Sequence, residues 1–187
     1  LPLHNNEDLV IMVASTSKIT FAGGGVSCLV ASDNNILDIK KRLFYQSISQ
    51  DKMNQLRHLK FFNDVDSIKA HMKKQAAILK PKFDCVISHL NNELANKGIA
   101  SWHEPNGGYF ISLDVMPGCA KRVGQLCKEA GVVLTTIGAT FPYGNDPQDS
   151  NIRIAPSFPT IDELSQAATL LCICVQIAAI EQLTINN

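Results

Sequence analysis

The chain has 187 residues, 45% of them hydrophobic, which is enough for one domain with a sizeable core or for two small domains. Lys and Arg together number 17, as do Asp and Glu, so the formal net charge is zero. This balance gives no indication of a nucleic-acid partner or of an acidic membrane surface, both of which need a basic patch.

Two predicted strands and the loop between them open the chain. The apolar run of residues 9–14 predicts a buried strand of a parallel sheet, and residues 27–32 predict a second short strand. Two helices should follow, over residues 33–48 with Asp33 as the N-cap, and over residues 51–62. This part of the chain is typical of the last strands of a larger α/β sheet.

A long helix is the clearest prediction in the chain. Between residues 64 and 97, apolar residues recur at spacings of three, four or seven, which gives one apolar stripe with lysines on the other side. Pro81 lies within this stripe. Because proline lacks an amide hydrogen, it should kink the helix or split it near Lys80.

A compact α+β unit is predicted after the long helix. Residues 99–115 are typical of a β-hairpin, with Asn106 and Gly107 at its turn. The further predicted elements are a helix over 120–131 closed by Gly131, strands over 132–135 and 151–155, and a last helix that begins at a capping box of Thr160 and Glu163 and ends near residue 183. The sequence therefore predicts an α/β protein with two domains, residues 1–62 and residues 63–187.

Lys18 is the candidate reactive residue, because it lies between a hydroxyl cluster (Ser15, Thr16, Ser17) and three consecutive glycines. An exposed loop lysine is the commonest alternative. The other interpretation is an amine at the carboxyl end of a strand, where α/β folds bind their ligands, beside hydroxyls and backbone amides that suit an anion. The P-loop pattern G-x-x-x-x-G-K-[ST] is absent, and a Schiff base to pyridoxal phosphate is the other chemistry that uses such an arrangement.

Five motifs in chain order carry a family resemblance: STSKITFAGGGVS, DKMNQLRH, EPNGGYFISLDV, GATFPYG and NIRIAPSFP. From about residue 8 to residue 183, the chain resembles the pyridoxal-phosphate-dependent aminotransferases, and more narrowly the divergent bacterial aspartate aminotransferase subgroup of MocR type. The resemblance implies fold type I. Residues 1–62 would be the end of the cofactor-binding large domain, and residues 63–187 the small C-terminal domain.

The resemblance also implies roles for the residues around Lys18. Lys18 would form the Schiff base that holds pyridoxal 5'-phosphate, and it would then move the proton between the substrate α-carbon and the cofactor. Ser15 and Ser17 resemble the hydroxyls that bind the cofactor phosphate in the family.

Val26 is a departure from the family pattern. Many relatives have, eight residues after the lysine, an arginine that binds the phosphate. We expect backbone amides of Gly23, Gly24 and Gly25 to replace part of that arginine. The alternative is that the three glycines only make a tight turn.

Arg153 is the candidate for substrate binding. Because it alternates with Ile152 and Ile154, it should lie on the opposite face of its strand, and the pattern alone leaves open that it only reaches solvent. In the family an arginine at this place binds the substrate α-carboxylate through two parallel hydrogen bonds, for which a guanidinium is better suited than an ammonium.

Tyr143 is a second candidate for contact with the substrate, and the alternative is that it is only a tyrosine in a turn. Arg57 is expected to form an interface or surface ion pair, the alternative being a substrate side-chain carboxylate.

Some residues that the family needs are missing. Its aspartate that pairs with the pyridine nitrogen lies about 35 residues before the lysine, and Asp8 is too close to Lys18 to be that residue. The chain thus looks like the C-terminal part of a homodimeric transaminase, which moves an amino group between aspartate, or a related amino acid, and a 2-oxo acid by a ping-pong route. We expect the fragment alone to be inactive. The alternatives are a non-catalytic fragment, a pyridoxal-phosphate-dependent β-lyase and an aminotransferase-like regulator domain.

The remaining features are unremarkable. Six cysteines show no C-x-x-C pair, and we expect all of them to be reduced core residues of a cytoplasmic protein. The longest apolar run, residues 167–180, is shorter than the ~18 residues of a membrane helix, so no membrane partner is expected. The histidines show no metal-ligand spacing and should lie on the surface or on helix faces.

Overall fold

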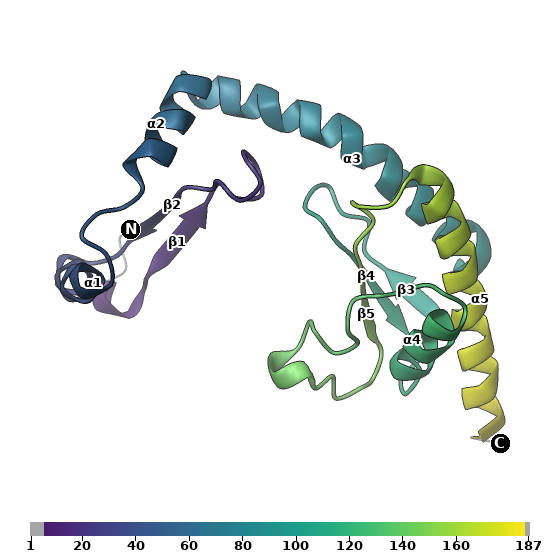
Figure 1. Cartoon of the computed structure of the whole chain (residues 1–187). Helices are drawn as coiled ribbons and strands as arrows, with labels where there is room; N and C mark the ends of the chain where they lie inside the picture. Colours follow the sequence, from purple (N-terminus) through teal and green to yellow (C-terminus); the bar gives the residue numbers. More distant parts are fainter. Residues whose placement is uncertain (1–5, 186–187) are drawn as a thin grey trace. The chain divides into compact units, whose positions relative to one another are not determined.

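The computed structural model describes residues 6–185 and divides into two compact units, residues 1–75 and residues 76–187 (Figure 1). The division falls inside helix α3 (Val65–Leu94). The sequence predicts a domain boundary after residue 62, thirteen residues earlier, and that boundary stays a prediction. The architecture mixes helices and antiparallel strands in both units.

An antiparallel strand pair followed by two helices forms the first unit. A 3-10 turn over Glu7–Leu9 leads into β1 (Met12–Ser15), which pairs with β2 (Ser27–Val30). Helices α1 (Asp33–Gln46) and α2 (Lys52–Phe61) follow. The loop that closes the strand pair is therefore the hydroxyl, lysine and glycine segment singled out in the sequence.

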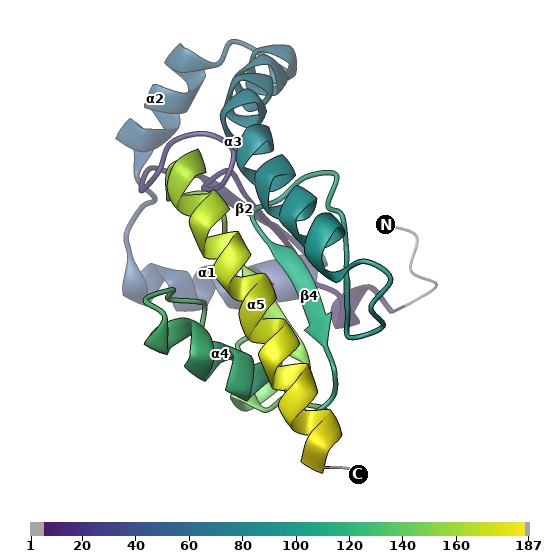
Figure 2. The same cartoon turned by 90° about the vertical axis from the view of Figure 1, so that its right-hand side faces the viewer.

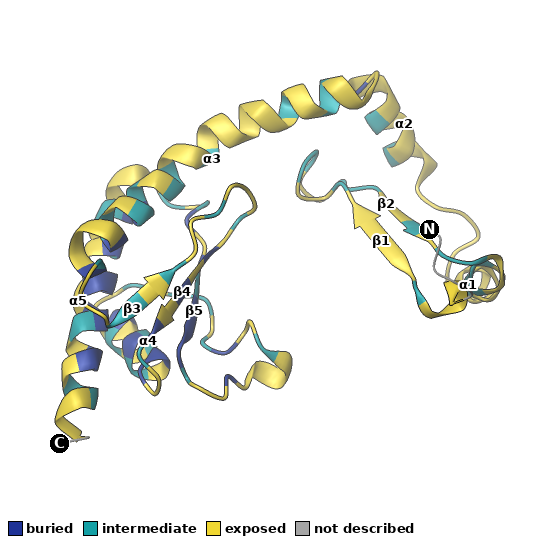
Figure 3. Ribbon diagram, turned by 180° about the vertical axis from the view of Figure 1, so that it is seen from behind, coloured by how far each residue is buried: buried dark blue, intermediate teal, exposed yellow. Residues whose placement is uncertain are grey.

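The expectation of a buried strand in a parallel sheet is wrong for β1. Its partner β2 runs antiparallel, and all four residues of β1 are exposed (Figure 3). Val13 is 74% exposed and Val30 is 58% exposed. The apolar run is a strand, as predicted, but no layer within the described residues of this unit covers it.

Side-chain caps fix where the first two helices begin. The Ser32 hydroxyl accepts a hydrogen bond from the Asn35 amide at 3.3 Å, so Ser32, and not the predicted Asp33, caps α1. The Asp51 carboxylate accepts one from the Asn54 amide at 2.9 Å and caps α2. Such caps satisfy amides that have no partner inside the helix.

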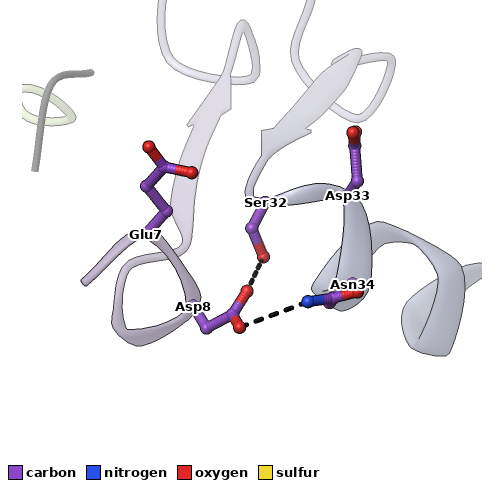
Figure 4. A pocket seen from close by; sticks show the side chains of 5 residues that line it. All are labelled: Glu7, Asp8, Ser32, Asp33 and Asn34. Atoms are coloured by element: carbon purple, nitrogen blue, oxygen red, sulfur yellow. Dashed lines mark hydrogen bonds between the residues drawn. The ribbon is translucent and has the colours of Figure 1, made fainter. Parts of the chain in front are cut away.

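Asp8 ties the start of this unit to α1. Its carboxylate accepts hydrogen bonds from the Ser32 hydroxyl and from the Asn34 side chain beside a shallow polar hollow (Figure 4). The Asn35 side chain donates to the Asp8 carbonyl at 2.9 Å. These side-chain hydrogen bonds, that of Ser32 first, lower the pKa of Asp8 from its ordinary value.

Helix α3 is uninterrupted, so of the two effects expected from Pro81, a kink or a split, the split does not occur (Figure 1). Proline removes the hydrogen bond to the Ala77 carbonyl, but the turns on both sides continue the helix. The C-terminal part of α3 belongs to the second unit. There it supplies three buried side chains to the core: Val86, Leu90 and Leu94.

The second unit is a three-stranded antiparallel sheet covered by helices on one face. Strands β3 (Ala100–Trp102), β4 (Ile111–Val115) and β5 (Asn151–Ile154) pair in the order β3-β4-β5. Helix α5 (Ile161–Ile185) runs beside the end of α3, with α4 (Ala120–Glu129) next to it (Figure 2). The predicted α+β character of this part is confirmed.

Strand alternation separates the two faces of this sheet. In β4, Ile111, Leu113 and Val115 are buried, whereas Ser112 and Asp114 lie on the other face and are exposed. The buried set packs against the inner faces of the helices (Figure 3). The opposite face of the sheet therefore carries polar side chains.

Local signals at the ends of helices are confirmed. Gly131, with φ of 85°, follows the end of α4, where a left-handed residue closes the helix. The Glu163 carboxylate accepts the Thr160 amide at 2.8 Å, and the Thr160 hydroxyl accepts the Glu163 amide at 3.3 Å. This is the predicted capping box at the start of α5.

The predicted hairpin over residues 99–115 is confirmed, because β3 and β4 are consecutive antiparallel strands. Trp102 pairs with Leu113, so Asn106 and Gly107 lie within a longer connection of residues 103–110. One strand prediction needs correction. Residues 132–135 form no strand; Val133 in this segment is 89% exposed. An apolar segment becomes a strand only where an unpaired neighbour is present to share its hydrogen bonds.

Helix α5 and the cysteines also differ from expectation. Helix α5 is long and apolar enough to cross a membrane, whereas the apolar run of residues 167–180 by itself was predicted to be too short. Its buried face is part of the core of the second unit, and a core helix of a soluble protein passes the same test.

All six cysteines are free, as predicted, but Cys28 is exposed and not a core residue.

We expect Leu90→Ala to lower the free energy of unfolding of the second unit by about 2–5 kcal/mol, because the deletion leaves a cavity in a close-packed core. Leu90 is fully buried. Chemical denaturation followed by the fluorescence of Trp102, the only tryptophan of the chain, measures the loss. Ile173→Ala, at a position that is 47% exposed, is the control with a smaller effect. Equal losses in both variants would contradict this view of the core.

Candidate active site

Lys18 lies in a tight turn directly after β1. The amides of Ile19 and Thr20 both donate to the Thr16 carbonyl at 2.9 Å, which forms a single helical turn with Lys18 inside it. The predicted position of Lys18, after the end of a strand, is thus observed. The Lys18 residue is exposed, as is the strand that leads to it.

Thr16 closes the loop that contains Lys18. Its amide donates to the Val26 carbonyl at 2.8 Å, and its hydroxyl accepts the Val26 amide at 2.9 Å. Val26, which stands where many aminotransferases have an arginine, therefore contributes backbone groups to the closure of the loop. The closure holds the glycine run close to the Lys18 turn.

Ser15 and Ser17 form a hydroxyl pair next to Lys18. The Ser15 hydroxyl donates to the Ser17 hydroxyl at 3.1 Å, and the Ser17 amide donates to the Ser15 hydroxyl at 3.2 Å. Both residues are exposed. Because the Ser17 oxygen accepts in this pair, its own hydroxyl hydrogen remains available for another acceptor.

The three glycines differ in their surroundings. The Gly24 amide donates to the Phe21 carbonyl at 3.1 Å, whereas the amides of Gly23 and Gly25 donate to no backbone carbonyl within residues 6–185. A Cβ on Gly25 would lie 2.6 Å from the Ser17 Cβ, so only glycine allows this approach. The run is therefore a tight turn, and its amides are donors of the kind that bind an anion.

Helix α2 supports this loop from one side. The Asn54 side chain donates to the Gly25 carbonyl at 3.1 Å. The His58 ring reaches the Thr20 hydroxyl with Nε2 at 2.9 Å and the Asn54 carbonyl with Nδ1 at 2.9 Å. Arg57 lies beside the glycine run, with Nη1 3.6 Å from the Cβ position of Gly24. The sequence alone does not predict these three contacts, because the spacing of the residues in DKMNQLRH indicates a helix but not which loop the helix packs against.

Arg153 lies on the polar face of the sheet in the second unit. Ile152 and Ile154 beside it are buried, so the predicted alternation is confirmed. The Arg153 guanidinium carbon lies 4.5 Å from the centre of the Phe110 ring. Its buried Nε has no hydrogen-bond partner within the described residues. A buried N–H donor without an acceptor fits a site that receives an anion.

A hydrogen-bond network on the same face holds β5 in register. The Asn151 side chain donates to the Ser112 hydroxyl at 2.9 Å and to the Asp114 carboxylate at 2.7 Å. It also accepts from the Thr140 hydroxyl at 2.8 Å. The network fixes the strand two residues before Arg153.

Asp146 organises the turn that leads into β5. The carboxylate accepts the amides of Ser150 and Asn151 at 2.8 Å and that of Gln148 at 3.0 Å. The backbone hydrogen bond from Asn151 is the main cause that lowers the pKa of Asp146. The segment DPQDS carries the signal of such a turn, because aspartate commonly accepts amides that follow it.

A pH dependence follows from Asp146. Because its pKa is lowered in the folded protein, it stabilises the fold above the ordinary carboxyl pKa, and this contribution is lost as the pH falls through the folded value. We expect Asp146→Ala to lower the melting temperature at pH 7 and to flatten its fall on the acid side. Thermal unfolding from pH 7 down to about pH 2 measures this. Asp84→Ala, which breaks only an exposed pair with Lys80, is the control; an unchanged acid slope in Asp146→Ala would contradict the argument.

The predicted residues fall into two groups. In the first unit the structure brings Ser15, Ser17 and the glycine run together around Lys18. Arg153 and Tyr143 belong to the second unit. Tyr143 lies in the 3-10 turn Pro142–Gly144 with φ of 58°, and its side chain is fully exposed. Its predicted role stays a prediction.

Comparisons with known proteins are consistent with this geometry. Residues 4–187 match the family model described as aspartate amino-transferase. A Mycolicibacterium smegmatis protein named as an aminotransferase is 48% identical over 178 residues, which are 95% of this chain and 42% of that protein. The crystal structure of an aspartate transaminase from Corynebacterium glutamicum aligns with a TM-score of 0.87 and 45% identity, over 91% of this chain and 40% of that chain.

A more distant structure shows the same fold. The alpha-aminoadipate aminotransferase of Thermus thermophilus, solved with N-(5'-phosphopyridoxyl)-L-leucine, aligns with a TM-score of 0.70 at 16% identity, over 90% of this chain and 42% of that chain. The chain spans less than half the length of the relatives it matches.

Proposed function

Because the chain belongs to the aspartate aminotransferase family, we propose that the protein containing it is a pyridoxal-phosphate-dependent transaminase. The reaction would move an amino group between aspartate, or a related amino acid, and a 2-oxo acid by a ping-pong route. The observation that carries the proposal is Lys18, held in a hydrogen-bonded turn between a hydroxyl pair and a glycine run.

The residues around Lys18 fit a phosphorylated cofactor. The free hydroxyl hydrogen of Ser17 and the amides of Gly23 and Gly25 are donors of the kind that bind a phosphate. No side chain fills the space beside Gly23, whose Cβ position has no atom within 4 Å. Pyridoxal 5'-phosphate, when bound, supplies an electron sink for the α-carbon of the substrate.

Each side chain then has a defined task. Lys18 would hold the cofactor covalently at rest, and its amine, once the substrate has displaced it, would take the proton from the α-carbon of the substrate. Arg153 binds the α-carboxylate through two parallel hydrogen bonds, which uses the Nε donor that the described residues leave without a partner. Tyr143 would lie on the substrate side. Ser15 orients the Ser17 hydroxyl.

We further propose that the whole protein is a cytoplasmic homodimer and that the isolated 187-residue chain is inactive. Lys18 and β1 are exposed in the first unit, whereas proton transfer at the substrate benefits from a site that excludes water. The exposed apolar residues of β1 and β2 support burial by further protein in the whole molecule.

A covalent labelling experiment tests the proposal. The complete gene product and the isolated chain are each incubated with pyridoxal phosphate, reduced with borohydride and digested. Mass spectrometry should find the reduced cofactor on Lys18 of the complete gene product and little or none on the isolated chain. A complete gene product without label on Lys18 would overturn the proposal.

A donor screen separates transfer from elimination. With aspartate as donor, a transaminase consumes the 2-oxo acid and releases no ammonia. A β-lyase needs a substrate with a leaving group on its β-carbon, such as a cysteine S-conjugate, and from that substrate it releases ammonia without consuming the 2-oxo acid. We expect the first outcome. A labelled protein with neither activity would favour the regulator-domain alternative.

A further inference from the structure

We propose that His58 is a positioning residue that holds the Lys18 turn in place through the hydroxyl of Thr20. His58 lies on α2, forty residues after Lys18, and the proposed function gives it no role. The expected effect of His58 on cofactor binding rests on the proposed function, in which Lys18 binds the cofactor. The contacts that carry it all lie within the first unit.

The hydrogen bonds of the His58 ring define its tautomer. The Asn54 carbonyl, 2.9 Å from Nδ1, is only an acceptor, so Nδ1 carries a hydrogen. In the neutral ring Nε2 is therefore an acceptor. The hydroxyls of Thr20 and Thr16 lie 2.9 Å and 3.4 Å from it. One ring nitrogen thus meets two hydroxyl groups of the loop.

These two threonines flank the lysine symmetrically. Thr16 and Thr20 each lie two residues from Lys18, and the Thr20 amide donates to the Thr16 carbonyl at 2.9 Å. The single hydrogen of the Thr20 hydroxyl is shared between the Thr16 carbonyl, at 3.0 Å, and His58 Nε2, at 2.9 Å. The bonds close the turn, and His58 ties the closed turn to α2. The position of Lys18 therefore depends on the position of this ring.

The ring itself has little freedom to move. Phe21 contacts the His58 ring edge-on, with the two ring centres 5.0 Å apart. The ring centre of Phe62, a residue that is only 6% exposed, lies 6.2 Å from that of His58. Its Nδ1 bond is to the carbonyl one helical turn earlier in α2. The neighbouring Asn54 side chain holds the Gly25 carbonyl on the other side of the loop. Helix α2 therefore fixes both ends of the segment around Lys18.

This support affects chemistry because a lysine side chain is long and flexible. Its amine reaches a reacting atom reproducibly only if the backbone that carries it is fixed. Loss of the His58 contact should leave the overall fold intact and loosen the turn. We expect faster loss of cofactor from the complete gene product, by about tenfold, the effect of one lost hydrogen bond to a partly buried group.

A matched set of substitutions isolates the contact. His58→Gln keeps a polar group near the position of Nε2, whereas His58→Asn keeps one only near the position of Nδ1. Thr20→Val removes the partner hydroxyl at nearly constant size, and Thr20→Ser retains it. The control is His89→Asn in the second unit, which removes a comparable bond, from Nε2 to the Ser165 hydroxyl at 3.0 Å.

Two measurements on the complete gene product decide the inference. The first is the rate of cofactor release, followed by the visible absorbance of the lysine-linked cofactor. The second is hydrogen exchange at the amides of Ile19, Thr20 and Val26 without cofactor. We expect His58→Asn and Thr20→Val to speed release and exchange, and His58→Gln, Thr20→Ser and His89→Asn to resemble the wild type. Because Thr20→Val also removes the hydroxyl bond to the Thr16 carbonyl, the double variant of His58→Asn and Thr20→Val should be no worse than Thr20→Val alone.

The possible failures are distinguishable. Equal behaviour of His58→Gln and His58→Asn, or wild-type exchange in Thr20→Val, would overturn the positioning role. If His58→Asn does not fold, the Thr20→Val and Thr20→Ser pair decides alone. If the wild type shows no Lys18 adduct, the proposed function fails, and hydrogen exchange still tests whether His58 holds the turn.

Discussion

Lys18→Ala in the complete gene product should abolish transamination and the borohydride-fixed label at position 18. Removal of a positioned general base costs about 10²–10⁴-fold in rate, and the covalent attachment is lost as well, so we expect at least the upper end of that range. Steady-state turnover with aspartate and a 2-oxo acid, together with peptide mapping, measures both effects.

The control for this substitution is another lysine of the same unit. Lys60 lies on α2 and is exposed, so Lys60→Ala should retain turnover and label. A Lys18→Ala protein that keeps substantial turnover, or that carries the reduced cofactor on a different lysine with activity intact, would refute the assignment of Lys18.

Arg153→Lys should lower kcat/KM about 100-fold for both the amino donor and the 2-oxo acid. The substitution keeps the charge but loses the planar fork and its two charge-assisted hydrogen bonds, which contribute about 1.5–3 kcal/mol each. The label at Lys18 should be unaffected, because Arg153 is proposed to bind substrate and not cofactor. A parallel loss with both substrates is expected, since each carries the same α-carboxylate.

Arg122→Ala is the matched control. Arg122 binds the Glu181 carboxylate with Nε at 2.6 Å and Nη2 at 2.7 Å, so its removal should lower stability slightly and leave kcat/KM unchanged. If Arg153→Lys loses cofactor label instead of substrate affinity, Arg153 acts elsewhere in the site than proposed.

The parts of the fold that sequence predicts well are those decided by neighbours along the chain. The Thr160–Glu163 capping box and the Gly131 helix end involve residues within one turn of each other, and both are observed. The failures concern partners farther away. The run of residues 9–14 indicates a strand but not the direction of its neighbour, and residues 132–135 are apolar but meet no strand to pair with.

The candidate site shows the same division. Lys18, its hydroxyl pair and the glycines are adjacent in the sequence, so composition and the family resemblance were enough to identify them as candidates. His58 meets Thr20 across 38 residues, and Asp146 accepts backbone amides of the residues that follow it, as the segment DPQDS suggests. The His58 contact depends on how α2 packs, which periodicity does not give.

The exposed strand pair has a consequence for handling the chain by itself. Within the described residues, β1 and β2 pair only with each other, so each has an outer edge of backbone N–H and C=O groups without a ladder partner. Apolar side chains such as Met12 and Val13 flank this edge, and neither strand contains a proline or a charged residue to block it. Such an edge is a template for strands of neighbouring molecules, so concentrated samples of the isolated chain should self-associate through intermolecular β-pairing.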